Sequence, residues 1–240
     1  ADLGAGANIG NRTQVRAGAF RGLGEFEASS NSSDLLPDGD FDTGAAYLSL
    51  RYDSLDDPFF ATQGLLLYGD YQWHRDSLGS DFDFDRFEFM GQGAISFGED
   101  KANNLVFTAR ATVLDDAPRA PQYFSRLGGL FNLSGISQDL LAGRQLAFLM
   151  AQYQRKLTRS GVLPIDVPVY AGFSVEGGNL WQDRSDMDLG DLVMAGSIYL
   201  AVNSPLGPVY IAYGRNEEEL DAIYLSIGWP FLQPSGRLIR

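Results

Sequence analysis

Residues 64–74 read "GLLLYGDYQWH" and alternate between two kinds of side chain with a period of two. One set is Leu65, Leu67, Gly69, Tyr71 and Trp73, and the other is Leu66, Tyr68, Asp70, Gln72 and His74. Because successive side chains of a β-strand point to opposite faces, this spacing predicts a strand with one apolar face and one largely polar face. The segment has about the ten residues that a tilted membrane-spanning strand needs.

The same alternation recurs along the whole chain. Clear examples are "AAYLSLRYDS" (45–54), "RFEFMGQGAISF" (86–97), "NLVFTARATVL" (104–114) and "AIYLSIGWPF" (222–231). About eleven segments of this kind predict an all-β fold, a transmembrane antiparallel up-and-down β-barrel with aromatic residues near the strand ends. The competing fold is a soluble β-sandwich, whose strands are typically shorter, about 5–6 residues.

The links between these segments alternate between long and short, as they do in barrels that cross the bacterial outer membrane. The longest link covers residues 115–144, and most of the acidic links fall on its side of the predicted barrel. That acidic rim is either an ordinary polar surface or a site where divalent cations bridge the protein to lipopolysaccharide. The formal net charge of −13 argues against nucleic acid as a partner, because an acidic surface repels phosphate.

Residues for catalysis or metal binding are not apparent in the sequence. There is no cysteine and no Gly-x-Ser-x-Gly, and "GFSVEG" (172–177) has one residue too many and lies in a predicted strand. His74, the single histidine, shares the polar face with Asp70, so we interpret it as a lumen or rim residue. The acidic run "DFDFD" (81–85) is interpreted as a solvated loop. We therefore expect no catalytic residue, metal or cofactor in this chain.

Four stretches resemble the BamA/TpsB superfamily of outer-membrane barrels. They are "LRYDSLDDPFFATQGLLLYGDYQW" (50–73), "VPVYAGFSVEGGNLW" (167–181), "NSPLGPVYIAYG" (203–214) and "YLSIGWPF" (224–231), in the order in which the superfamily has them. The resemblance implies a bacterial outer-membrane location. It also implies that the last stretch is the signal read by the barrel assembly machinery, carried by Tyr224, Gly228, Trp229 and Phe231.

The resemblance also gives a role to "GGLFNLSGISQDLLAGRQ" (128–145). In this superfamily the longest extracellular loop folds into the lumen, and an Arg at its tip pairs with an acidic residue on an inward-facing strand. The matching tip here is Leu133, Ser134, Gly135 and Ile136, with Ser134 in place of the Arg, and the matching acidic residue is Glu176. A buried carboxylate without its cation is costly. Glu176 would therefore pair with another basic lumen residue, bind water, or accept hydrogen bonds from Ser134.

The tip followed by "LLAGRQLAF" (140–148) looks most like the subgroup in which a patatin-like lipase precedes the barrel. That resemblance implies a barrel of about sixteen strands. We expect residues 1–231 to be its C-terminal part, N-terminally incomplete, and residues 232–240 to be a C-terminal tail.

The resulting functional hypothesis is an anchor and translocator for a patatin-like phospholipase, in a type V secretion system of the fused two-partner type. The lipase activity would belong to residues outside this chain. Two alternatives stay open: a protein-assembly or secretion pore, and a barrel-embedded lipid hydrolase. The expected partners are outer-membrane lipids and lipopolysaccharide, the assembly machinery, and the chain's own N-terminal passenger, and self-association is compatible with each hypothesis.

Overall fold

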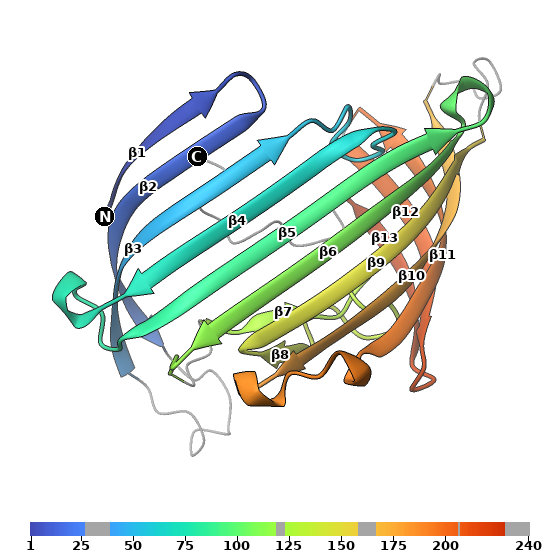
Figure 1. Cartoon of the computed structure of the whole chain (residues 1–240). Helices are drawn as coiled ribbons and strands as arrows, with labels where there is room; N and C mark the ends of the chain where they lie inside the picture. Colours follow the sequence, from blue (N-terminus) through green and yellow to red (C-terminus); the bar gives the residue numbers. More distant parts are fainter. Residues whose placement is uncertain (27–38, 119–122, 158–166, 206, 229–240) are drawn as a thin grey trace.

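The computed structural model describes residues 1–26, 39–118, 123–157, 167–205 and 207–228. Eleven long antiparallel strands form one sheet in the order β1-β2-β3-β4-β5-β6-β9-β10-β11-β12-β13 (Figure 1). They are β1 (Asp2–Ile9), β2 (Thr13–Phe26), β3 (Gly39–Asp53), β4 (Gly64–His74), β5 (Phe84–Phe97), β6 (Asn103–Asp115), β9 (Gln145–Lys156), β10 (Val169–Trp181), β11 (Val193–Ser204), β12 (Gly207–Asn216) and β13 (Asp221–Ile227). The predicted all-β antiparallel fold and its strand number are confirmed.

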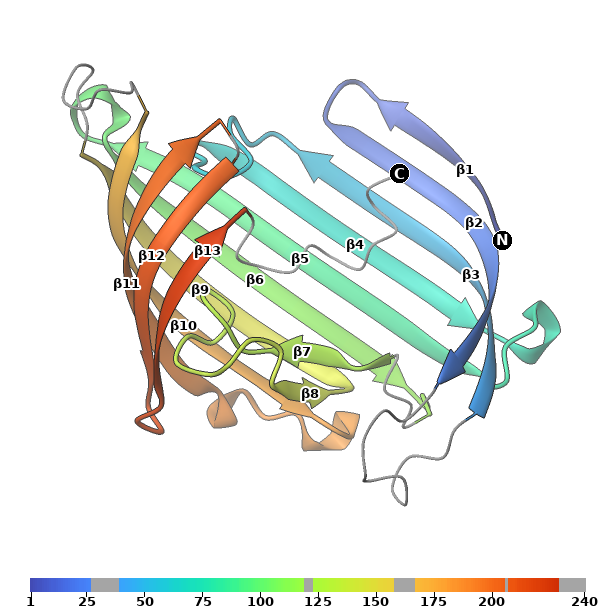
Figure 2. The ribbon, with the colours of Figure 1, turned by 180° about the vertical axis from the view of Figure 1, so that it is seen from behind.

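The sheet is strongly curved, and two further short strands lie on its concave side (Figure 2). These are β7 (Ser125–Leu127) and β8 (Leu141–Gly143), which pair with each other inside the connection between β6 and β9. The sequence did not predict them, because three residues are too few to show a period of two. Within the described residues, β1 and β13 are the two edges of the large sheet.

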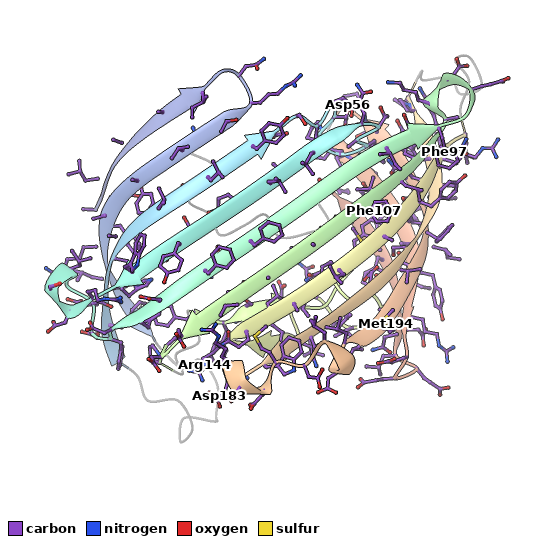
Figure 3. All side chains as sticks on the ribbon, in the orientation of Figure 1. Asp56, Phe97, Phe107, Arg144, Asp183 and Met194 are labelled. Carbon is purple, nitrogen blue, oxygen red and sulfur yellow. The ribbon has the colours of Figure 1, made fainter. Side chains whose placement is uncertain are left out.

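Burial alternates along each strand as the sequence predicts. The apolar side chains lie on the exposed outer face and the polar ones on the buried concave face, as in a membrane barrel. On β4, Leu65 is 40% exposed on the convex side, whereas Asp70 is 5% exposed on the concave side. Phe107 and Met194 also lie on the outer face and are about half exposed (Figure 3). A soluble sandwich would bury the apolar face of each strand, so that alternative is wrong.

The two ends of the sheet carry different connections (Figure 3). Arg144 and Asp183 lie at the end where residues 116–144 leave the sheet, which we call the loop end. Asp56 and Phe97 lie at the opposite end, which we call the turn end. The alternation of long and short links holds only in part, because the turn-end connection 54–63 is itself a folded turn that reaches the concave side.

No helix in the described part of the chain is long and apolar enough to cross a membrane. The last described strand ends at Ile227. Trp229, Phe231 and the proposed tail 232–240 lie outside the described residues.

Candidate functional site

The connection between β6 and β9 turns back into the concave side of the sheet, where its tip is buried. Phe131 is 1% exposed, and Leu133 and Ser134 are not exposed at all. The tight bend at the start of the tip uses Gly128, whose φ is +121°. A Cβ atom there would lie 2.1 Å from the carbonyl oxygen of Ser137, so the bend requires glycine.

Glu176 on β10 is the main attachment point of this tip. Its Oε2 accepts the backbone N–H groups of Leu133 at 2.9 Å and Ser134 at 2.7 Å, and its Oε1 accepts the Ser134 hydroxyl at 2.8 Å. The neighbouring hydroxyl of Ser174 donates a fourth hydrogen bond at 2.6 Å. These four donors compensate a carboxylate that is only 1% exposed, because hydrogen bonds to the charged form replace the lost water.

The other side of the tip contacts the last two strands of the sheet. The N–H of Gly135 donates to the Tyr224 hydroxyl on β13 at 2.9 Å, and that hydroxyl donates to the carbonyl of Ile136 at 3.2 Å. On β12, Gly214 leaves room for the approach, because a Cβ atom there would come within 2.7 Å of the Ser134 Cβ. The tip therefore joins β10, β12 and β13.

A cation from the wall also holds the loop. Arg110 on β6 donates to the side-chain carbonyl of Asn132 at 2.6 Å, and its guanidinium lies 5.6 Å from the centre of the Phe148 ring. This contact combines a charge-assisted hydrogen bond with a cation–π interaction. The wall thus supplies an anion and a cation, and the loop supplies neutral polar groups.

Arg144 fixes the base of the loop at the loop end of the sheet (Figure 3). Its Nε donates to the carbonyl of Gln182 at 2.6 Å, one Nη donates to the carbonyl of Ala117, and the other pairs with Asp183. The planar guanidinium can satisfy three acceptors from two connections at once, which an ammonium group on a flexible stem does less well.

His74 lies in a different part of the concave side, as its register predicted. The ring stacks on Phe84 with centroids 4.0 Å apart, and its nitrogens contact Thr43 and Gln72. Gln72 in turn donates to Asp70 at 2.6 Å. The side chain is 2% exposed and faces away from the outer surface, so the geometry is that of a wall residue.

The candidate site is therefore a docking interface between the loop and the interior wall. Comparison with known protein families identifies the family of the chain. The model of the Omp85 superfamily domain matches residues 7–231 of the chain. The chain belongs to the Omp85 superfamily. It is accordingly an outer-membrane β-barrel protein.

A solved relative has the same fold. The chain is similar to the crystal structure of BamA from Haemophilus ducreyi lacking POTRA domains 1–3, with a TM-score of 0.73 and 12% identity. The similarity covers 92% of this chain but 51% of the BamA chain, so this chain spans about half the length of that relative. No curated protein matches the sequence.

The Omp85 resemblance led sequence analysis to five residues that the structure brings together. Leu133, Ser134, Gly135 and Ile136 form the buried tip, and Glu176 receives it. Among the alternatives left open for Glu176, the observed contacts are hydrogen bonds from the loop. Tyr224, named for the assembly signal, points inward to the tip, and the N–H of Gly228 donates to the carbonyl of Pro208 at 2.8 Å.

The sequence did not point to the cationic contacts of the loop, Arg110 and Arg144. A usable signal existed for Arg110, which falls on the polar face of its predicted strand. None existed for Arg144, whose acceptors lie 27 to 39 residues away in the chain. Phe60 lies in the stretch 50–73 that carries the family resemblance, but nothing local predicted its burial.

Proposed function

We propose that this Omp85 barrel is the membrane anchor and translocator of an N-terminal patatin-like phospholipase, in type V secretion of the fused two-partner type. The observation that carries the proposal is the way the interior loop docks. Its tip reads Leu133-Ser134-Gly135-Ile136 and is held by neutral donors to Glu176, where BamA/TpsB proteins have an Arg at the tip. This departure, followed by "LLAGRQLAF", resembles the lipase-linked subgroup.

The proposed orientation places the loop end outside the cell and the turn end in the periplasm. The exposed apolar outer face would contact phospholipid and lipopolysaccharide acyl chains. Tyr224, Gly228, Trp229 and Phe231 would carry the signal for the assembly machinery. Self-association of the barrel is compatible with this arrangement. The Omp85 fold is that of a transporter, and the proposed lipase activity belongs to residues outside this chain.

A protein-assembly or secretion pore of the BamA/TpsB type is the second candidate. The similarity to BamA at a TM-score of 0.73 favours it. The two candidates differ in what precedes the barrel in the full-length protein. A patatin domain would precede the barrel of a lipase anchor, whereas repeated periplasmic adaptor domains would precede the barrel of an assembly or secretion pore.

The deciding experiment is the intact mass and N-terminal sequence of the full-length protein purified from outer membranes. A Gly-x-Ser-x-Gly motif upstream of Ala1, together with phospholipase activity that is lost when its Ser is changed to Ala, would support the anchor. Periplasmic adaptor domains without that motif would overturn it in favour of the pore.

A further inference from the structure

The outer face of the sheet is hollowed near the middle of its strands. Small residues on four neighbouring strands form the floor of this depression, namely Gly91, Gly93, Ala109, Ala151 and Gly177. Larger apolar side chains stand around it, namely Leu65, Phe107, Leu149, Val175 and Met194. Phe107 and Met194 mark two of its sides in Figure 3. We call these residues the outer hollow, which has a volume of about 610 Å³.

The register of the strands creates the outer hollow. Gly91 lies opposite Ala109, and Leu149 lies between Ala109 and Gly177. The long side chains beside these small residues project from the sheet, because Phe107 is 51% exposed and Leu149 is 53% exposed. Since the chain is an outer-membrane barrel protein, this face contacts lipid, and an apolar depression in it accommodates hydrocarbon.

A cation lies beyond the outer hollow at the turn end. Arg155 is six residues after Leu149 on β9, so its side chain leaves the sheet on the same face, where it is exposed. Glu99 and Asp100 lie in the turn before β6, but within the described residues no carboxylate forms an ion pair with Arg155. Arg155 is therefore available to an anion from outside the chain.

Aromatic rings lie between Arg155 and the outer hollow. Tyr153 has Phe97 on one side and Phe173 on the other, with ring centroids 6.4 and 5.4 Å away. Its hydroxyl donates to the Asn103 side chain at 2.8 Å, and Asn103 lies opposite Arg155. Aromatic rings at this level are typical of the interface between the polar headgroups and the acyl chains.

The distance from Arg155 to the outer hollow matches the depth of one leaflet. The six residues from Leu149 to Arg155 span about 20 Å along the strand. At a strand tilt of about 40° this length corresponds to about 15 Å along the membrane normal. Half of an apolar band about 25–30 Å tall is about 12–15 Å. A lipid whose headgroup lies at Arg155 therefore has the end of its acyl chain at the level of the outer hollow.

The loop end of the same face carries carboxylates instead. Asp85 and Asp115 lie opposite each other on β5 and β6. Arg75 pairs with Asp85 at 2.7 Å, and Arg184 pairs with Asp115 at 3.3 Å. The charges on this face of the sheet therefore favour an anionic headgroup at the turn end.

We propose that the outer hollow and Arg155 together form a binding site for one phospholipid of the leaflet at the turn end. The lipid phosphate pairs with Arg155, and the end of one acyl chain occupies the outer hollow. The choice of a phospholipid over lipopolysaccharide rests on the proposed orientation, which places the turn end in the periplasm. The identity of the passenger does not enter the proposal.

The test is photocrosslinking in phosphatidylethanolamine vesicles that contain a small share of phosphatidylglycerol with a diazirine on the last carbon of one acyl chain. Purified full-length protein is inserted, irradiated and digested, and the crosslinked peptides are identified by mass spectrometry. We expect the crosslinks on the wild type to concentrate on the peptides that contain Ala109 and Ala151.

Two variants remove the two parts of the site. Gly93→Leu fills the outer hollow, and its Cβ atom would meet only the Leu65 Cδ1 within 4 Å, at 3.7 Å, so the side chain fits. We expect this variant to lower the crosslinking yield at Ala109 and Ala151 about fivefold. Arg155→Gln removes the cation and should lower the same yield about threefold.

Each variant has a matched control that should keep the yield within about twofold of the wild type. Gly69→Leu adds the same side chain on the outer face of β4, outside the outer hollow, where a Cβ atom meets nothing within 4 Å. Arg184→Gln removes an exposed cation at the loop end.

Several results would overturn the proposal. Crosslinks spread evenly over the outer face would mean ordinary contact with bulk lipid. An unchanged yield in Gly93→Leu or in Arg155→Gln would mean that the outer hollow or the cation holds no lipid. Stronger labelling of Ala109 and Ala151 by lipid A with the same diazirine would place the occupant in the other leaflet. A barrel dimer that Gly93→Leu dissociates would make the occupant a second copy of the chain.

Folding of each variant is checked by the heat-dependent gel mobility of the barrel. Ala151→Leu, which fills the outer hollow from β9, replaces Gly93→Leu if that variant does not fold. Protease access to the loop end on intact cells measures the orientation separately. A full-length protein without a lipase would overturn the proposed function and leave the lipid site standing.

Discussion

The carboxylate of Glu176 accepts both the backbone N–H and the hydroxyl of Ser134, at 2.7 and 2.8 Å. A neutral residue at the loop tip thus makes contact with the buried anion through two donors. The charge of Glu176 is balanced by dipoles from the loop and from Ser174. This arrangement makes the docking of the loop depend on hydrogen-bond geometry.

Replacing Glu176 by Ala should release the loop tip. The N–H groups of Leu133 and Ser134 would lose their acceptor, and an unsatisfied buried donor costs about 1–3 kcal/mol. We expect proteases added to intact cells to cut the loop of Glu176→Ala and to leave the wild type intact. Glu176→Gln keeps one acceptor oxygen and should show an intermediate rate, whereas a loop equally resistant in all three proteins would contradict the docking role.

Adding a side chain at Gly214 should disturb the same interface by steric overlap. In Gly214→Ala the new methyl group would lie 2.7 Å from the Ser134 Cβ and 3.2 Å from the Gly135 nitrogen. Overpacking of this kind costs about 1–3 kcal/mol, so the variant should unfold at lower temperature and expose its loop. Gly69→Ala is the control, because a Cβ atom there meets nothing within 4 Å, and equal loss in both variants would refute the steric explanation.

The base of the loop should tolerate Arg144→Lys poorly. Lysine keeps the charge but reaches the acceptors on Ala117, Gln182 and Asp183 less well, because its three N–H groups share one nitrogen. We expect a loss of about 1.5–3 kcal/mol in the free energy of unfolding, measured by urea titration in detergent. The exposed pair Arg184–Asp115, 3.3 Å apart, provides the control, since Arg184→Lys should change stability by less than about 0.5 kcal/mol. Similar losses of stability in both variants would contradict the role of the three hydrogen bonds that Arg144 donates.

The turn that carries Phe60 should loosen in acid. Partial burial raises the pKa of Asp56, but hydrogen bonds from the Thr62 hydroxyl and from the N–H groups of Thr62 and Gln63 outweigh it, so the pKa lies below 3.8. A carboxyl with a lowered pKa stabilises the fold fully above its unfolded value and loses this contribution as the pH falls through its folded value.

Hydrogen exchange at the Thr62 and Gln63 amides measures this loosening. Protection should be constant above about pH 5 and should fall below pH 3.8, after correction for the intrinsic exchange rate. Asp56→Asn should have weak protection at every pH in this range. A wild-type profile that stays flat through pH 3 would show that the carboxylate does not hold the turn.

The sequence predicted the strands well because each carries its own signal. In β4 the alternation of Leu65 and Leu67 with Asp70 and Gln72 predicts both the strand and the face that each side chain occupies. The loop tip and Glu176 could be paired only through the superfamily resemblance, since no local pattern links residues that are 42 positions apart. The burial of Phe60 was beyond prediction, because it depends on the curvature that brings the turn between β3 and β4 against Tyr170 of β10.

The contacts of the loop tip also constrain the order in which the barrel can assemble. The bond from Gly135 to Tyr224 joins residues 89 positions apart, and β13 follows β9 to β12 along the chain. The tip therefore cannot make all of its contacts before the β12–β13 hairpin exists, and such long-range closure is slow. The contacts of Gly135 and Ile136 with Tyr224 stay unmade until β13 is in place. During this interval a chaperone or the membrane insertion machinery could bind the exposed loop.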